Sequence, residues 1–225
     1  KEVFAEELKK KFAELGFREV NVKPREVENR DQDPLIIEIY YNKLTEIDTY
    51  LKQCILVEIG SRSLREPFTQ RTFGTFVSQI YKDKLFADKP ISIPVVNPER
   101  TFLEKIFLLH EEFQKPQDKI RVERLSRHLY DIEKLSQTDY ATIALNDTRL
   151  YNTIVEHRRR FTPISGINYD KHNPKSIMFI PPDSIIKKWE LDYEEMKSNM
   201  IYGSLLSFDE LIKRLKELQD RISAP

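Results

Sequence analysis

Two short segments of this chain place charged side chains beside an apolar helical pattern. Residues 98–105 read PERTFLEK, and residues 124–131 read RLSRHLYD. In the first segment Thr101 and Lys105 lie one helical turn apart, and Glu112 continues the same side of the predicted helix. The opposite arc is formed by Phe102, Leu103, Ile106, Phe107 and Leu109. Lys105 therefore points away from the apolar side of its own helix, where an amine can bind an anion.

The second segment places two cations, an imidazole and a carboxylate on one helical arc. These residues are Arg124, Arg127, His128 and Asp131, and the apolar stripe of the same helix is Leu125, Leu129 and Ile132. Such a face could bind a phosphate group. The simpler interpretation of these residues alone is a solvated helix face with an ordinary Arg–Asp pair.

Glu58 is a carboxylate at the end of an otherwise apolar strand pattern. A charged group there costs desolvation energy unless it is paired, exposed at the sheet end or bound to a cation. Residues 60–65 (GSRSLR) follow directly and supply small residues and positive charge. Two interpretations stay open, a metal ligand or a strand-end carboxylate paired with Arg62.

The composition limits the classes of partner. The 225 residues suffice for one large domain or two small ones, and 37 basic residues balance 37 acidic ones. Because the formal net charge is zero, binding to nucleic acid requires a local patch. Residues 158–160 (RRR) beside Phe161 suit an RNA contact, although basic residues are also favourable at a helix C-terminus.

Several kinds of site are excluded by motif. Cys54 is the only cysteine, which rules out disulfides and cysteine-based zinc sites, and the four histidines lack metal-ligand spacing. Phosphate-binding loops, dinucleotide fingerprints and hydrolase elbows are absent too. The sequence has no membrane-spanning apolar run and no signal peptide, so we expect a cytoplasmic protein that does not bind membranes. Its first residue is Lys1 rather than Met, which suggests a beginning further upstream.

The hydrophobic periodicity predicts an α/β part followed by a helical part. A helix is expected over residues 3–15, strands over 35–41, 54–59 and 91–96, and a long helix from Pro98. Further helices are expected after Asn146-Asp147, Asp183 and Ser207, the last with a capping box. We therefore expect domains at residues 1–97 and 98–225, with residues 162–182 as a surface loop.

Taken in their order along the chain, the charged segments resemble those of the AbiEii/AbiGii family of nucleotidyltransferase toxins. The resemblance rests on residues 57–63 (VEIGSRS), 99–105 and 124–131, with further similarity in residues 192–210. It implies a nucleotidyltransferase-like mixed sheet with flanking helices, followed by a helical bundle. It also implies a toxin of a type IV toxin–antitoxin or phage-defence system that transfers NMP from an NTP to a tRNA-like acceptor. Its partners would be Mg²⁺ or Mn²⁺, the NTP, the acceptor and a cognate antitoxin.

The resemblance also assigns roles to individual residues. Glu58 corresponds to a metal-site carboxylate, Lys105 to a nucleotide-contacting lysine and Asp131 to a catalytic aspartate on a helix. The resemblance extends the nucleotide site to Thr101, Arg127, His128 and Arg62, with Arg71 as a further phosphate or RNA contact. The chemistry agrees, because carboxylates hold Mg²⁺ against an attacked phosphate and a lysine neutralises the triphosphate.

One family motif is absent from this sequence. The family has a Gly-Gly/Ser turn followed about a dozen residues later by alternating acids, as in Asp-x-Asp. Residues 31–33 (DQD) alternate but lack the glycine turn. Either the motif precedes Lys1 and the chain as given is N-terminally incomplete, or this member has lost catalysis. Two alternatives follow, a non-catalytic module that binds nucleotide, RNA or protein, and a helical interaction protein with Glu58 and Lys105 on unrelated surfaces.

Overall fold

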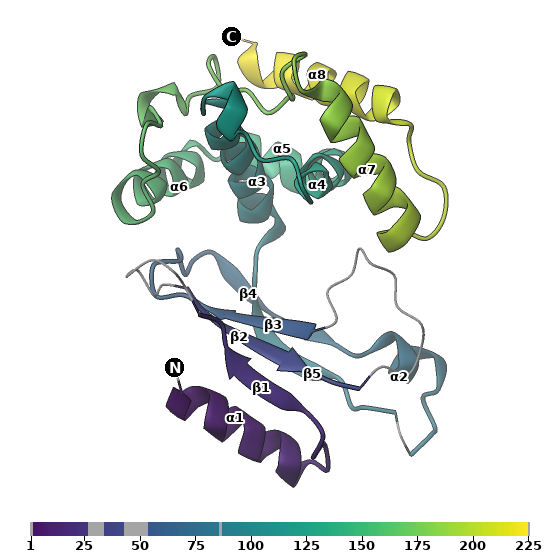
Figure 1. Ribbon diagram of the computed structural model, residues 1–225. Coiled ribbons are helices and arrows are strands. Elements are labelled where there is room, and N and C mark those ends of the chain that lie inside the picture. The colour runs from purple at the N-terminus through teal and green to yellow at the C-terminus, as the bar shows by residue number, and fades with distance from the viewer. Residues whose placement is uncertain (1, 27–33, 43–53, 86, 225) are drawn as a thin grey trace. The chain divides into compact units, whose positions relative to one another are not determined.

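The computed structural model is a mixed α/β protein with short antiparallel strands and many helices, as the sequence predicts (Figure 1). None of the described helices is both long and apolar enough to cross a membrane. The structure describes residues 2–26, 34–42, 54–85 and 87–224. The alternating acids at residues 31–33 lie outside these ranges.

The chain divides into two compact units. The first unit comprises residues 1–63 and 190–205, and the second comprises residues 64–189 and 206–225. The secondary structure changes from strand to helix near residue 97, but the domain boundary expected there stays a prediction. The two compact units meet in the sequence between residues 63 and 64, between 189 and 190, and between 205 and 206.

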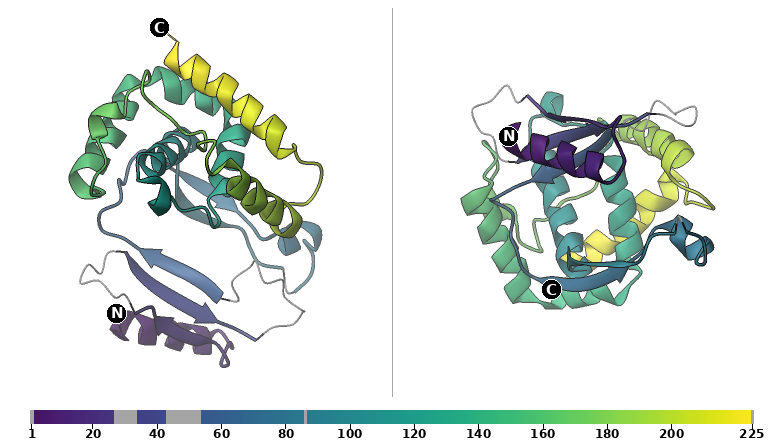
Figure 2. Two further views of the ribbon diagram at one scale, coloured as in Figure 1. Left: turned by 45° about the horizontal axis from the view of Figure 1, so that its top comes forward. Right: turned by 90° about the horizontal axis from the view of Figure 1, so that it is seen from below.

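The first unit contains an antiparallel sheet with the order β1-β2-β3 and a helix packed on one face. Its elements are α1 (Glu2–Glu14), β1 (Asn21–Pro24), β2 (Leu35–Tyr40) and β3 (Cys54–Ile59). Ala5 of α1 is buried with Val22, Ile37 and Ile39 of the sheet, and α1 runs along the strands in both views of Figure 2. The helix ends at Gly16, whose φ of +93° favours glycine.

These elements confirm the helix and the two strands expected in this region. Strand β1 was not expected, because its four residues include Lys23 and Pro24 and show no clear alternation. Ile37 and Ile39 point to the face that α1 covers. Glu58 is opposite Ile36 in the register, so its side chain lies on the other face of the sheet.

The second unit is mostly helical and includes a strand hairpin. Its elements are β4 (Phe68–Phe73), α2 (Phe76–Ile80), β5 (Ile91–Val96), α3 (Pro98–Phe113), α4 (Ser126–Ser136), α5 (Asp139–Asn146), α6 (Thr148–Phe161) and α8 (Phe208–Ser223). Helix α7 (Ile186–Met200) begins in this unit, and its later residues belong to the first. Helix α3 packs against α4, α5 and α6, and α8 packs against α4 (Figure 1).

Helix α3 is the centre of the second unit because it is apolar on a wide arc. The five residues of the predicted arc are at most 2% exposed, and Leu125, Leu129 and Ile132 of the α4 stripe are buried as predicted. Two helix caps also form at residues where the sequence predicts a helix start. The Asp147 carboxylate accepts from the Leu150 N–H at 2.8 Å, and Ser207 forms its capping box with Glu210.

The prediction of a surface loop at residues 162–182 is wrong, because part of this segment is buried. It contains a 3₁₀ turn, Tyr169–Lys171, and it buries Tyr169, His172, Ile177 and Phe179. The prolines and the weak periodicity correctly indicate irregular backbone. The segment is nevertheless part of the core, because irregular backbone can supply apolar side chains wherever its polar groups find partners.

Candidate functional site

The centre of the candidate site is an ion pair between two helices of the second unit. Lys105 of α3 and Asp131 of α4 lie 2.7 Å apart, from Nζ to Oδ2. Their side chains are 22% and 38% exposed, so the pair is accessible from solvent yet partly shielded. Because α3 and α4 pack through their apolar stripes, the two charged residues meet at the edge of that contact. The structure thus brings together two residues that the sequence analysis selected separately.

His128 adds an imidazole beside this pair. Its Nδ1 is buried and has no hydrogen-bond partner in the structure. Burial, together with the positive charges of Lys105 and Arg127, lowers the pKa of His128 to about 4, although the charge of Asp131 opposes the shift. His128 is therefore neutral at pH 7, and the positive charge for a phosphate comes from lysine and arginine.

A second buried imidazole, His110, also has a pKa lowered to about 4, mainly by burial and also by His172. Since an unfolded histidine titrates near pH 6.5, the unfolded chain binds the extra protons between about pH 6.5 and 4. Stability is therefore present above this window and is lost as the pH falls through it. We expect His128→Gln to make the stability difference between pH 7 and pH 5 smaller by about 2 kcal/mol.

Urea unfolding at the two pH values measures this effect. The matched control is His157→Gln on α6, because this histidine is less buried and its pKa is lowered less. An unchanged stability difference in the His128 variant would contradict a neutral, buried imidazole at this position.

Two further predicted site residues lie on the same helices. Arg127 is exposed on α4, next to His128, and can reach a ligand from solvent. The Thr101 hydroxyl lies one turn before Lys105 and donates to the Asn97 carbonyl oxygen at 3.2 Å, which leaves its lone pairs as acceptors. Both positions agree with a site on this side of α3 and α4.

Two details of the predicted helical faces are wrong. Glu112 does not continue an open strip, because it is only 2% exposed and accepts from the Arg121 N–H at 2.8 Å. Burial raises the pKa of Glu112, but hydrogen bonds from Arg121 and Lys115 outweigh it and lower the pKa overall. Arg124 does not share the α4 arc, since it precedes the helix with a φ of +59°.

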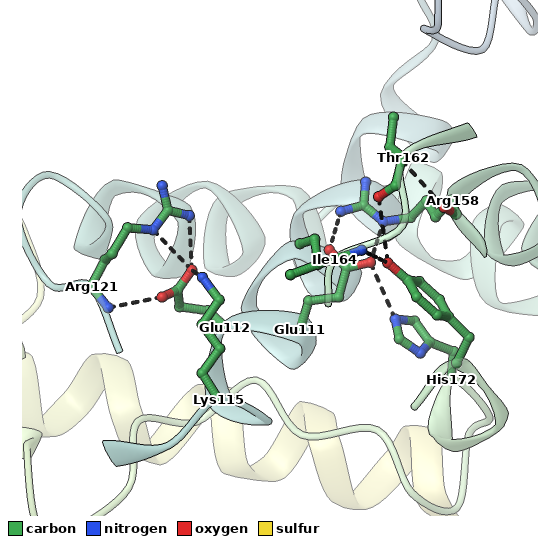
Figure 3. A network of polar contacts seen from close by, with 9 residues as sticks. Glu111, Glu112, Lys115, Arg121, Arg158, Thr162, Ile164 and His172 are labelled. Carbon is green, nitrogen blue, oxygen red and sulfur yellow. Dashed lines mark hydrogen bonds and ion pairs between the residues drawn. The ribbon is translucent and has the colours of Figure 1, made fainter. Parts of the chain in front are cut away.

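The neighbouring Glu111 anchors a second polar network, which Figure 3 shows pointing away from Glu112. Its carboxylate accepts from Arg158 Nε at 2.7 Å and from the Arg158 Nη2, and His172 Nε2 lies 3.4 Å away. Burial opposes ionisation of Glu111, but Arg158 and His172 lower its pKa overall. The Tyr169 ring stacks on His172 at 4.8 Å. This network holds α6 and the 162–182 segment against α3.

The three arginines at residues 158–160 on α6, whose sequence suits an RNA contact, therefore have different partners in the structure. Arg158 is committed to Glu111, and Arg159 pairs with exposed Asp170 at 2.7 Å. Arg160 lies over the ring of Phe161, 5.4 Å from its centre. Arg158 thus has a structural role, whereas Arg159, Arg160 and Phe161 are exposed.

Glu58 and Arg62 belong to the first unit and Arg71 to the second, on β4. Glu58 is exposed near the end of β3. Its carboxylate therefore stays hydrated and needs no partner to offset a cost of desolvation. Arg62 is exposed in the turn that follows β3. The convergence of Glu58 with Lys105 on one nucleotide stays a prediction.

A metal centre needs several convergent ligands, and Glu58 supplies one. Within the described ranges, no group of three or more His, Cys, Asp or Glu side chains is arranged to hold a metal ion. These residues alone therefore do not form a two-metal site. A metal bound with a nucleotide would take its other ligands from the phosphates or from residues outside the described ranges.

Sequence reasoning missed two buried ionic residues of the second unit, Arg100 and Glu133. Arg100 is 4% exposed and pairs with Glu104 at 2.9 Å, and Glu133 is 1% exposed and pairs with Arg214 at 2.8 Å. Arg121, which holds Glu112, was also missed. The available signal was the presence of charged residues within strongly apolar helical arcs.

Fold and site together define a class of protein. A mixed α/β chain whose helical part carries an accessible lysine–aspartate pair, a nearby arginine and a neutral imidazole is suited to binding phosphorylated ligands. The chain belongs to the family of AbiEii nucleotidyl transferase toxins of type IV toxin–antitoxin systems, whose family model matches residues 1–214. No curated protein matches the chain. The family confirms the predicted class of toxin and implies an antitoxin partner.

Proposed function

We propose that this chain transfers NMP from an NTP to an RNA acceptor with a tRNA-like end, as the toxin of a bacterial toxin–antitoxin or phage-defence system in the cytoplasm. The family membership supports the reaction class. The observation that carries the assignment is the 2.7 Å pair of Lys105 and Asp131, because it presents a positioned ammonium beside open solvent.

The side chains of this site have distinct roles in the proposal. Asp131 holds the Lys105 ammonium in one place, so that little reorganisation is needed when a triphosphate binds. Arg127 adds a second positive charge, and Thr101 offers a hydroxyl. Neutral His128 can hydrogen-bond a sugar or phosphate oxygen without adding charge at pH 7.

A metal ion and three residues on or near the strands complete the proposed site. Mg²⁺ or Mn²⁺ would accompany the NTP and supply charge neutralisation at the reacting phosphate. Glu58 would contribute one ligand, and Arg62 and Arg71 would contact phosphate or RNA. Each of these roles rests on the family resemblance and on the exposure of the residues.

The test is transfer of label from α-³²P-NTPs to total tRNA by the full-length protein in the presence of Mg²⁺. We expect Glu58→Gln to lower the initial rate by at least roughly 100-fold, because the amide loses the negative charge that attracts a metal ion. The control is Asp83→Asn, which changes an exposed acid in a turn of the second unit. Equal rates in the wild type and the Glu58 variant would remove Glu58 from the site.

A non-catalytic binding module is the second candidate. It is favoured by one observation, the lack of a metal-ligand cluster in the described ranges. Such a module would bind NTP in calorimetry, and Lys105→Met would weaken that binding. It would transfer no label to RNA with any of the four NTPs.

A further inference from the structure

The first turn of α4 carries Arg127 and His128, yet its N-cap residue supplies no side-chain hydrogen bond. That residue is Leu125, whose side chain cannot accept from the first backbone N–H groups of the helix. The preceding residue, Arg124, has a φ of +59°, a left-handed conformation that is unfavourable for a residue with a Cβ atom. Such backbone persists only where the surrounding structure holds it. The start of α4 therefore depends on what holds the connection from α3.

That connection is held by Glu112, near the end of α3. One oxygen of its carboxylate accepts from the Arg121 backbone N–H at 2.8 Å. The other oxygen accepts from Nε and Nη2 of the same arginine at 3.1 and 2.8 Å. The Leu125 N–H donates to the Val122 carbonyl oxygen, and the His128 N–H donates to the Leu125 carbonyl oxygen, both at 2.9 Å. Hydrogen bonds thus lead from Glu112 into the first turn of α4.

Glu112 and Lys105 extend from the same side of α3, about two turns or roughly 10.5 Å apart along its axis. Lys105 contacts α4 at Asp131. Glu112 contacts the connection that leads into α4, where Figure 3 shows Arg121 lying against it. Helix α3 therefore holds α4 at two places, one before its first turn and one after it. All of these residues belong to the second unit.

We propose that Glu112 is a positioning residue of the nucleotide site. Through the backbone of Arg121, it sets the position of the first α4 turn relative to Lys105. Arg127 and His128 move with that turn. The inference rests on the proposed function, because it takes these side chains to bind one NTP. Without Glu112, the strained backbone before α4 can relax and the first turn can open.

Amide hydrogen exchange tests this role without any ligand. In Glu112→Met of the full-length protein, we expect the backbone N–H groups of Arg121, Leu125 and His128 to exchange at least roughly tenfold faster. The reason is that the connection loses a hydrogen bond to a charged acceptor. The variant should still fold, because the Arg121 side chain is 63% exposed and can be hydrated instead. Urea unfolding followed by Trp189 fluorescence checks the fold.

Two variants serve as controls. Glu133→Met on α4 removes another buried carboxylate, 1% exposed, that is paired with a half-exposed arginine, but this arginine lies on α8. Arg121→Met removes the guanidinium and keeps the backbone N–H that donates to Glu112. Both should leave the exchange of the Leu125 and His128 N–H groups within about threefold of the wild type.

The nucleotide readout separates positioning from general damage. In Glu112→Met, we expect the KM for the NTP in label transfer, and its dissociation constant in calorimetry, to rise at least roughly fivefold. The kcat should stay within about threefold, because Lys105 keeps its place on α3. Glu133→Met should change none of these values by more than about twofold.

The outcomes distinguish this inference from the proposed function. Unchanged exchange in Glu112→Met, an equal change in Glu133→Met, or faster exchange with unchanged NTP affinity would overturn the inference. A wild-type protein that transfers no label and binds no NTP would instead overturn the proposed function, whatever the exchange shows.

Discussion

Lys105→Met is expected to lower kcat/KM for label transfer by about 10²- to 10³-fold, the usual cost of losing one positioned charge at a reacting phosphate. Methionine keeps the length of the lysine stem and removes the ammonium. The pair with Asp131 at 2.7 Å is lost, but both residues are partly exposed, so the fold should tolerate the change. Initial rates at varied NTP concentration measure the effect.

The matched control is Lys115→Met. Lys115 follows α3, pairs with Glu112 at 2.8 Å and is 19% exposed, compared with 22% for Lys105. Its loss should leave kcat/KM within about twofold of the wild type, because Arg121 still holds Glu112. If both lysine variants lost activity equally, the effect would reflect charge or stability in general rather than a nucleotide site at Lys105.

The largest expected effect on stability comes from Arg158→Met. This change leaves the Glu111 carboxylate, which is 2% exposed, without its main partner. Removing one member of a buried ion pair costs about 3–5 kcal/mol of the free energy of unfolding. Urea unfolding followed by fluorescence reports on the correct region, because Trp189 is the only tryptophan and packs against Phe113 at 5.2 Å.

The neighbouring residue provides the control for this prediction. Arg159→Met breaks a pair with Asp170, which is 79% exposed, and should cost less than about 1 kcal/mol. The double variant Glu111→Gln with Arg158→Met should recover part of the lost stability, because an amide is cheaper to bury than a carboxylate. Similar losses in the two single arginine variants would contradict a buried Glu111.

Much of the local structure could be predicted because it depends on neighbours in the sequence. Pro98 begins α3 and Ser207 caps α8, both as expected. The sides of Lys105 and Asp131 on their helices follow from a repeat of 3.6 residues per turn. Strand β4 was missed, because its sequence FTQRTF contains polar residues at every position except the ends.

The sequence by itself determined the helical faces, the order of charged segments and the family resemblance, which the family match confirms. Only the tertiary structure decided that Lys105 and Asp131 meet and that Glu112 is buried although it shares a helical side with Lys105. The physical reason is that the repeat of a helix fixes the direction of a side chain around its own axis. What covers that direction depends on chain segments far away in sequence, such as α4 beside Lys105 and Arg121 beside Glu112.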